Sequence, residues 1–453
     1  MNKIANRAWA GMVLAFALFL GMFVIVIRYF RESENWYLHH SNSAVYTNGR
    51  LNSGVIIDRA GNLLLDASDG RVYPEDGTLR RSTIHLLGDV QGNIPDYMMD
   101  YYSNELTAYD LFNGAQSGRG VSMELTVNGQ VQKIAYQALA GKAGTVGVYN
   151  YKTGEILCMV STPGFDPTTP EEVDDSEAYA GAYVNRFLHG SYIPGSVFKV
   201  ITAAAAIGEI PDLESRVFHC SGQWIVDGVV VTCSGVHNDI RFDTAFTKSC
   251  NVVFAQLAVE LGEETLKKYA EDAGLTKSVE FDGFKTAKGS VDLDRVSTGA
   301  LAWAGVGQHN NQINPCQYMT YMGAIANGGT SAKPYVVSRI CCGQEETYRV
   351  ATTMNQPMLE QGVADQLVQT MHNAVVNNYG EYHFAGLYGG AKSGTAERGG
   401  DLRPNALFAG FIQDANYPLA FVVVVEGGGS GSQTCIPIVS QVLNACVAAM
   451  DME

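Results

Sequence analysis

The pattern of hydrophobic and polar positions divides the chain into one long apolar segment near its start and a body of much shorter apolar runs. Trp9 to Ile27 is a stretch of about 19 apolar residues without a charge, which is long enough to cross a bilayer as a helix. Later runs, such as Leu419 to Val425, have the length of strands. Lys3 and Arg7 precede the apolar segment, so we expect an uncleaved, single-pass anchor with the rest of the chain outside the cell. A cleaved signal peptide is the alternative.

Beyond the anchor, the periodicity predicts strands at both ends of the body and helices between them. Two short strands are predicted around Ala60-Gly61-Asn62, and Asn113 to Gly120 is typical of a linker. Further strands are predicted at 145–151, 156–161, 390–397, 408–413 and 419–426, and helices at 129–139, 252–261 and 438–450. This distribution predicts an α+β fold in which one sheet is assembled from distant segments.

Composition and charge narrow the function classes. The chain has 453 residues, a net charge of -16 and no basic run, which argues against nucleic acid as a partner. Nine cysteines leave at least one unpaired. Cys220 and Cys233 flank a predicted hairpin at 223–232, where a disulfide and two free thiols are equally expected. A zinc site with His219 or His237 is the weaker alternative.

The segment around Ser196 carries the first candidate chemistry. Pro194 and Gly195 predict a turn, and the alanines from 203 to 206 predict a helix, so Ser196 is expected at the start of that helix. Lys199 lies three residues later on the same face. A desolvated lysine near the positive end of a helix loses its proton more easily and can deprotonate a neighbouring serine. Ser196 as a simple helix cap is the alternative.

Two more patterns supply possible partners for this pair. Ser249 and Asn251 stand immediately before a predicted helix and offer a hydroxyl and an amide, although Asn251 alone is better explained as a cap. Lys392-Ser393-Gly394-Thr395 is expected on a strand, with Ser393 and Thr395 on one face where two hydroxyls suit a carboxylate. Lys392 adds positive charge, and Gly394 is expected to leave room for a ligand backbone.

Taken together, Ser-x-x-Lys, Ser-x-Asn and Lys-Ser-Gly in this order resemble the signature set of penicillin-binding proteins and serine β-lactamases. The resemblance covers most of the chain. Asp58-Arg-Ala-Gly61 resembles the marker of the class B, monofunctional penicillin-binding proteins, and Gly305-Val-Gly-Gln308 with Asn314-Pro315 resembles their segment between the second and third motifs. His309 replaces a common glycine, and Phe408 stands where tryptophan is common.

The resemblance implies a peptidoglycan D,D-transpeptidase that uses no metal and no cofactor. Ser196 would attack the carbonyl between the two D-alanines of a stem peptide, with Lys199 as general base. Ser249 and Lys392 would return the proton to the leaving D-alanine, and Asn251 would position the donor amide. The amine of a neighbouring stem would then resolve the acyl-enzyme, whereas a β-lactam antibiotic would leave it stalled.

The remaining implied site roles belong to the third motif. Ser393 and Thr395 would bind the terminal carboxylate beside Gly394. The backbone N–H groups of Ser196 and Thr395 would form the oxyanion hole, and a single donor of this kind is typically worth about 3 kcal/mol.

The resemblance also implies an architecture and a partner. We expect a cytoplasmic tail (1–8), a transmembrane anchor (9–28), a small mixed pedestal or dimerisation-like domain (29–120) and a penicillin-binding transpeptidase domain (121–453) with a mainly antiparallel sheet flanked by helices. The pedestal is too short for a glycosyltransferase, so the expected partner is a multi-pass membrane glycosyltransferase of the shape, elongation, division or sporulation type.

Three other functions remain open at the level of sequence. A β-lactamase would need an efficient route for water to deacylate Ser196, and such enzymes are usually smaller. A D,D-carboxypeptidase would transfer the acyl group to water instead of an amine. A membrane-bound β-lactam sensor or a catalytically silent wall scaffold is the non-enzyme alternative, although a silent scaffold would be expected to lose one of the three motifs.

Overall fold

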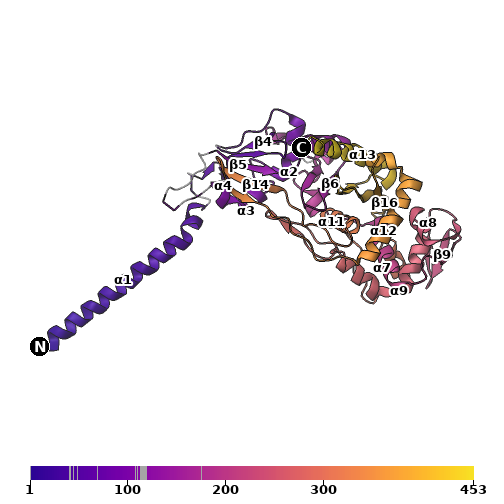
Figure 1. Cartoon of the computed structure of the whole chain (residues 1–453), viewed down its shortest axis with the longest axis horizontal. Coiled ribbons are helices and arrows are strands. Elements are labelled where there is room, and N and C mark those ends of the chain that lie inside the picture. The colour runs from indigo at the N-terminus through magenta and orange to yellow at the C-terminus, as the bar shows by residue number, and fades with distance from the viewer. Residues whose placement is uncertain are drawn as a thin grey trace.

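The computed structural model describes residues 2–452 except residues 40, 41, 44, 48, 69, 108, 110, 113–119 and 175. The predicted linker Asn113–Gly120 therefore lies, apart from Gly120, outside the described residues. Helix α1 (Asn2–Tyr37) projects as a single rod from one end of a folded body (Figure 1). Its apolar window has none of its residues buried, so α1 is a candidate membrane span.

A second helix, α13 (Gly431–Met450), is also long and apolar enough to cross a membrane, but 44% of its window is buried. It packs against α5 and against the central sheet, and Val439, Val442 and Leu443 belong to the core. We therefore describe α13 as a core helix of the folded body.

The core is built on a five-stranded antiparallel sheet with the strand order β16-β17-β18-β6-β7. Its strands are β6 (Gly144–Asn150), β7 (Ile156–Thr162), β16 (Gly389–Ala396), β17 (Asn405–Ile412) and β18 (Leu419–Val425). Every residue of β17 and β18 is buried, which explains why these strands read as continuous apolar runs without alternation. The predicted joining of strands from both ends of the body is confirmed.

Helices cover both faces of this sheet. Helices α5 (Gly129–Ala138) and α13 pack together on one face, and α11 (Pro315–Ala326) and α12 (Gln361–Ala374) pack together on the other. Asn128 caps α5, because its side chain accepts hydrogen bonds from the backbone N–H groups of Gln130 and Val131. The predicted fold class, a mainly antiparallel sheet flanked by helices in an α+β chain, is confirmed.

A second five-stranded sheet lies between α1 and the central sheet (Figure 1). Its order is β15-β14-β5-β3-β4, from β3 (Val55–Ile57), β4 (Leu63–Asp66), β5 (Val121–Leu125), β14 (Val337–Cys342) and β15 (Glu345–Arg349). Strand β3 pairs with β5 in parallel, and β5 pairs with β14 in antiparallel fashion. Segments on both sides of residue 120 therefore share backbone hydrogen bonds.

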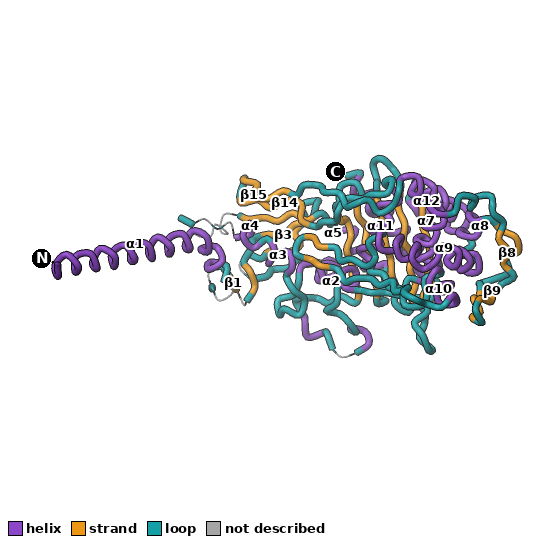
Figure 2. The backbone as a smooth tube through the Cα atoms, turned by 90° about the horizontal axis from the view of Figure 1, so that it is seen from below, coloured by secondary structure: helices purple, strands orange, loops and turns teal. Residues whose placement is uncertain are grey.

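The helices that carry the candidate site lie at the end of the body opposite to α1, as both views show (Figures 1 and 2). They are α7 (Lys199–Glu209), α8 (Phe242–Thr247), α9 (Asn251–Asp272) and α10 (Thr298–Gly305). The helix predicted at 252–261 forms the first part of α9, which continues to Asp272 beyond a kink at Gly262, where the φ is 78°.

A small insert extends beyond these helices. It consists of two hairpin-like pairs, β8 (Phe218–Cys220) with β11 (Asn238–Ile240) and β9 (Gln223–Val226) with β10 (Val229–Thr232). The hairpin predicted at 223–232 is confirmed. Short elements elsewhere in the described chain are β1 (Tyr46–Thr47), β2 (Arg50–Leu51), α2 (Gly77–Leu87), α3 (Tyr97–Tyr101), α4 (Ser103–Thr107), α6 (Arg186–His189), β12 (Glu280–Phe281) and β13 (Phe284–Lys285).

Candidate active site

Ser196 lies on a single 3-10 turn, Gly195–Phe198, that leads directly into α7. The sequence predicted Ser196 as the first residue of the α-helix, but regular α-helix begins only at Lys199, because Gly195 has a φ of 53° and the following turn is tighter. In a 3-10 turn, side chains three residues apart eclipse each other, so Ser196 and Lys199 still lie on one face. Ser196 is half-buried, and Lys199 is fully buried.

Contacts from a distant segment fix this turn. Gly195 donates its N–H to the carbonyl of Gly307 at 2.9 Å, and the Tyr318 hydroxyl donates to the carbonyl of Val197 at 2.7 Å. A Cβ on Gly307 would lie 1.9 Å from the Gly195 oxygen. The glycine in Gly305-Val-Gly-Gln308 is therefore needed for the close approach of the two backbones.

Ser249 and Asn251 of the Ser-x-Asn motif form hydrogen bonds with the buried amine of Lys199. The Lys199 Nζ lies 2.6 Å from the carbonyl oxygen of Ser249, 3.0 Å from its Oγ and 2.7 Å from Asn251 Oδ1. Ser249 has a φ of 53°, a left-handed conformation that is rare for serine and is maintained here by its surroundings. Asn251 donates its side-chain N–H to the carbonyl of Thr232 at 2.8 Å.

Lys392 completes the polar core of the site. Its Nζ donates to Ser249 Oγ at 3.0 Å and to the Ser393 carbonyl at 3.1 Å. The Ser249 hydroxyl thus bridges two lysine amines, and both lysines have no exposed surface. Burial lowers the pKa of Lys392 to about 7, and burial, followed by the charge of Lys392, lowers the pKa of Lys199 well below 10.5.

The three hydrogen-bond partners of Lys199 Nζ are oxygen acceptors, so a protonated amine donates to all three and a neutral amine donates to two of them. A neutral amine has two N–H donors and one lone pair. The Ser249 carbonyl and Asn251 Oδ1 accept the two donors, which leaves the lone pair for a hydroxyl hydrogen. Among the described residues this hydroxyl is that of Ser249, and Lys199 makes no hydrogen bond with Ser196 Oγ. Such contacts often form only when substrate is bound.

The third motif lies on β16, which is an edge strand of the central sheet. Ser393 and Thr395 face the cavity, as the predicted alternation requires, and Lys392 is buried on the opposite side. The Ser393 N–H points out of the sheet edge and donates to the Tyr379 hydroxyl at 3.1 Å. Because N–H groups two residues apart in a strand point the same way, the Thr395 N–H also faces away from β17.

Gly394 serves a different purpose from the one predicted. A Cβ at Gly394 would lie 2.7 Å from the Pro194 carbonyl oxygen and 3.0 Å from Val197 Cγ1. The space beside Gly394 is therefore filled by the nucleophile turn of the protein itself, and the absence of a side chain brings β16 against Ser196. From the sequence we expected this space to hold a ligand backbone. The contact with Pro194 could not be predicted, because the two residues lie some 200 positions apart in the chain.

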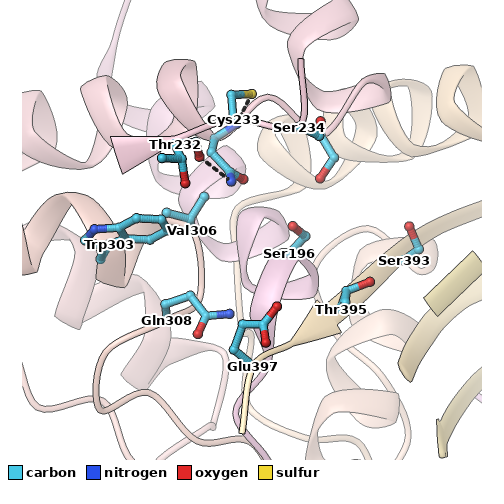
Figure 3. Close-up of a pocket in the computed structure, with 12 residues that line it drawn as sticks. Ser196, Thr232, Cys233, Ser234, Trp303, Val306, Gln308, Ser393, Thr395 and Glu397 are labelled. Carbon is cyan, nitrogen blue, oxygen red and sulfur yellow. Dashed lines mark hydrogen bonds between the residues drawn. The ribbon is translucent and has the colours of Figure 1, made fainter. Parts of the chain in front are cut away.

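These elements enclose one cavity of about 690 Å³ (Figure 3). Ser196, Thr395 and Ser393 lie along one side of it, with Thr232 and Ser234 of the insert above and Gln308 and Glu397 below (Figure 3). Its lining residues are Ser196, Thr232, Cys233, Ser234, Ser249, Asn251, Trp303, Val306, Gln308, Ser393, Thr395 and Glu397.

The structure brings together all eight site residues predicted from sequence. Ser196, Ser249, Asn251, Ser393 and Thr395 line the cavity, the two lysines lie buried behind it, and Gly394 contacts the nucleophile turn.

Sequence reasoning missed several other residues of the site. Tyr379 bonds Ser393 from a π-helical turn that carries no motif, and Trp303 lines the cavity from α10. Glu397 follows Thr395 by two residues, so strand alternation was a usable signal for it.

The cysteines predicted to flank the hairpin also lie beside this cavity. Cys220, Cys233 and His237 lie together, and Cys250, the central residue of the Ser-x-Asn motif, joins them. All nine cysteines are free thiols in this structure, so the predicted alternative of a Cys220–Cys233 disulfide is not the one found.

Comparison with known proteins agrees with this geometry. Residues 144–444 match the family described as the penicillin binding protein transpeptidase domain. Peptidoglycan D,D-transpeptidase PbpA of Mycolicibacterium smegmatis is 29% identical over 349 residues, which are 71% of this chain and 70% of that protein. Stage V sporulation protein D of Bacillus subtilis is 28% identical over 413 residues, which are 85% of this chain but only 60% of the relative.

Among solved structures, penicillin-binding protein A from M. tuberculosis, as a ceftriaxone acyl-enzyme complex, has the same fold. It superposes with a TM-score of 0.76 at 23% identity and covers 87% of this chain and 98% of that structure. The family match covers most of the chain and contains all three motifs of the cavity. The chain therefore belongs to the penicillin-binding protein transpeptidase family and is of its class B type.

Proposed function

We propose that this protein is a peptidoglycan D,D-transpeptidase that cross-links D-Ala-D-Ala stem peptides through an acyl-enzyme on Ser196 and is acylated there by β-lactams. One observation carries the proposal. The Ser249 hydroxyl lies between two fully buried lysine amines, directly behind the cavity where Ser196 and the Ser393–Thr395 edge meet.

Each residue of this arrangement has a role in acylation. The lone pair of Lys199 takes the Ser196 proton as Oγ attacks the carbonyl between the two D-alanines. The N–H groups of Ser196 and Thr395 stabilise the oxyanion. Lys392 and Ser249 then return the proton to the nitrogen of the departing D-alanine, which leaves the donor stem esterified to Ser196.

Substrate orientation comes from the walls of the cavity. The Ser393 and Thr395 hydroxyls, on one face of β16, bind the terminal carboxylate of the stem peptide. Asn251, whose amide is fixed by Lys199 and by the Thr232 carbonyl, positions the backbone amide of the donor. An amine of a second stem resolves the ester and forms the cross-link.

Intact-mass analysis after exposure to benzylpenicillin tests the nucleophile. We expect a persistent one-to-one adduct on the wild-type chain and none on Ser196→Ala. Ser191→Ala is the matched control, because Ser191 is an exposed serine five residues away. An adduct on Ser196→Ala would contradict the proposal, and rapid turnover of nitrocefin without adduct would favour a β-lactamase. Products formed from a D-Ala-D-Ala peptide with and without an amine acceptor separate cross-linking from D,D-carboxypeptidase activity.

For the location of the protein, we propose that α1 is a single membrane anchor and that the catalytic body lies outside the cytoplasm. The 36 residues of α1 extend over roughly 54 Å at 1.5 Å per residue, which exceeds the thickness of a hydrocarbon core. Helices α7, α9 and α10, around the cavity, lie at the end of the body away from α1 (Figures 1 and 2), so an anchored chain presents the cavity toward the wall. Protease treatment of intact spheroplasts should remove the body, whereas protection of the body would refute this orientation.

We further propose a membrane glycosyltransferase as partner, contacted through α1 and the proposed pedestal domain (29–120). Deleting residues 1–120 is a poor test, because β3 and β4 would leave the sheet and expose the edge of β5. We instead suggest replacing residues 9–27 by an unrelated apolar helix in the full chain. Loss of co-purification with the glycosyltransferase, with benzylpenicillin acylation retained, is the expected result; retained co-purification would exclude α1 from the contact.

A further inference from the structure

Three thiols and one imidazole converge beside the active site without a role in the reaction proposed above. The Sγ atoms of Cys220, Cys233 and Cys250 and a ring nitrogen of His237 all lie within 4.8 Å of one another. Cys220 and Cys250 are fully buried, and Cys233 and His237 are half-buried. Four soft or borderline donor atoms at this spacing are the ligand set of a structural zinc site.

Three of the six separations between the donor atoms match those of a tetrahedral centre, and the other three are at most 4.8 Å. With metal bonds of about 2.3 Å to sulfur and about 2.0–2.1 Å to nitrogen, tetrahedral angles require edges of about 3.8 Å between sulfurs and about 3.5 Å between sulfur and nitrogen. The structure has 3.8 Å between the Cys233 and Cys250 sulfurs. It has 3.6 Å from His237 Nδ1 to the sulfurs of both Cys220 and Cys233.

Three of the four residues come from the insert, which has little core of its own, and the fourth comes from the start of a core helix of the body. Cys220 ends β8, Cys233 follows β10, His237 precedes β11, and Cys250 stands immediately before α9. The insert that carries the first three exposes Val217, Ile225, Val230 and Val236. Small units with so little buried apolar surface are commonly stabilised by a metal or a disulfide.

The second candidate histidine of the sequence is excluded by its direction. His219 neighbours Cys220 on β8, so its side chain points to the opposite face of the strand. There it bonds Asp239 on β11 at 2.7 Å and is exposed. An outer contact supports Cys233 as a ligand, because the Asn251 N–H donates to its sulfur at 3.3 Å.

We propose that Cys220, Cys233, His237 and Cys250 bind one Zn²⁺ ion as a closed, four-coordinate structural site. On binding, the three thiols release their protons to solvent and bind as thiolates, and His237 binds as neutral imidazole through Nδ1. No position remains open for water or substrate, so the ion holds the insert on the body and takes no part in acyl transfer.

The proposed zinc site is also connected to the proposed catalytic residues Ser249 and Asn251, an inference that rests on the function proposed above. Cys250 stands between Ser249 and Asn251, and Cys233 follows Thr232, whose carbonyl accepts the Asn251 side-chain N–H. A metal that ties Cys233 to Cys250 therefore fixes both ends of that hydrogen bond. The four ligands are positioning residues for the second motif.

Metal content of the full chain, purified in detergent without chelator, tests the site directly. We expect about one zinc per chain by mass spectrometry of the elements. After removal of zinc, Co²⁺ should restore the charge-transfer and d–d absorption of tetrahedral thiolate coordination. Loss of an outer partner already weakens metal binding about 10–100-fold, so His237→Ala should weaken zinc binding by at least about tenfold.

Two variants serve as matched controls. His219→Ala removes the neighbouring histidine of the same insert, and Cys341→Ser removes a half-buried cysteine of β14. Both should keep zinc at the wild-type level. The proposal is overturned if the chain purifies without zinc and does not take up added Zn²⁺, if His237→Ala retains wild-type affinity, or if two of the three cysteines form a disulfide in the protein isolated from cells.

A rescue experiment tests the positioning role without any substitution. Chelated wild-type protein should melt at a lower temperature and react more slowly with benzylpenicillin, and added Zn²⁺ should restore both. If zinc raises the melting temperature and leaves acylation unchanged, the metal site stands and its positioning role is refuted. If no form of the protein reacts with benzylpenicillin, the proposed function fails while the metal content still decides the site.

Discussion

At the scale of single residues, the two buried lysines determine how the site should respond to pH. Lys199 acts as a base only when neutral, and burial followed by the charge of Lys392 lowers its pKa well below 10.5. Lys392 itself has a pKa of about 7, lowered by burial.

We therefore expect acylation by benzylpenicillin to accelerate as pH rises through neutrality. At low pH both amines gain protons, Lys199 loses its lone pair and the reaction slows. The measurement is the second-order acylation rate from about pH 5 to about pH 9, with folding followed in parallel. Lys392→Met removes a like charge, so the rising limb should move to higher pH. A rate that is flat or rises toward acid would exclude Lys199 as the base.

Tyr379 gives the second prediction at this scale. Its hydroxyl accepts the Ser393 N–H at 3.1 Å and bonds Ser393 Oγ at 3.0 Å, so it orients one of the two hydroxyls proposed to bind the substrate carboxylate. A hydrogen bond of this kind contributes about 0.5–1.5 kcal/mol, so Tyr379→Phe should slow acylation about two- to thirteenfold. The ring stays in its contact with Phe408, so the melting temperature should change little. Tyr382→Phe, on an exposed tyrosine, is the control; equal rates in both variants would remove Tyr379 from the site.

At this scale, the sequence predicted the residues that belong to short local motifs and missed those that act through contacts between distant segments. Ser196, Lys199, Ser249, Asn251 and the third motif are short patterns, each placed by local turn, helix or strand signals. Tyr379 acts through a contact between segments that share no local pattern, so no spacing in the chain indicates it. The fourth zinc ligand, Cys250, was visible only as the middle residue of a catalytic motif.

At the scale of elements, the site depends on how closely β16 approaches the nucleophile turn. Gly394 lacks the side chain that would meet the Pro194 carbonyl at 2.7 Å. This contact also brings the Thr395 N–H to the same side as Ser196, as an oxyanion hole of two donors requires. The sequence predicted both elements, but the approach between them depends on tertiary packing.

Gly394→Ala should therefore move apart the N–H groups of Ser196 and Thr395, the two donors of the proposed oxyanion hole. Adding a methyl group to a packed contact typically costs about 1–3 kcal/mol. If most of this cost falls on the acylation transition state, the acylation rate of Gly394→Ala should fall about tenfold or more. Gly362→Ala is the matched control, because Gly362 lies in α12 and a Cβ added there would have no atom within 4 Å. That variant should keep its acylation rate and gain slightly in stability. The measurement is the acylation rate of both variants by stopped flow. A wild-type rate in Gly394→Ala would contradict the role given to the close approach of β16.

At the scale of the whole molecule, noncovalent contacts join the anchor-side segment to the catalytic body in addition to the chain connection near residue 120. Strand β3 pairs with β5 inside one sheet, and Arg80 of α2 binds Asp166 through two bonds of 2.8 and 2.5 Å. Backbone and side-chain contacts therefore cross the proposed domain boundary near residue 120. The sequence predicted two separate domains from the change in composition near residue 120. It gave no sign that the domains share a sheet, because the parallel pairing of β3 with β5 leaves no local pattern in the chain.

Asp58 is the residue through which this joint can be tested. Its carboxylate is fully buried and accepts hydrogen bonds from the N–H groups of Ala60 and Asn62, at 3.0 and 2.7 Å, which closes the turn between β3 and β4. It also accepts the N–H of Gly129, the first residue of α5, at 2.9 Å. One side chain of the leading segment therefore caps a helix that covers the central sheet, which gives the Asp58-Arg-Ala-Gly61 marker a structural role.

We expect Asp58→Asn to weaken the joint and leave the chemistry intact. The amide has one acceptor oxygen where the carboxylate has two, and its NH₂ group faces N–H donors, so buried donors lose their partner at a cost of about 1–3 kcal/mol. Thermal unfolding should begin at a lower temperature, whereas acylation by benzylpenicillin well below that temperature should match wild type, because Asp58 lies on the anchor side of the body. Asp174→Asn, an exposed acid, controls for the loss of charge. Unchanged unfolding, or acylation that falls in the folded protein, would show that the marker acts in some other way than by joining the two segments.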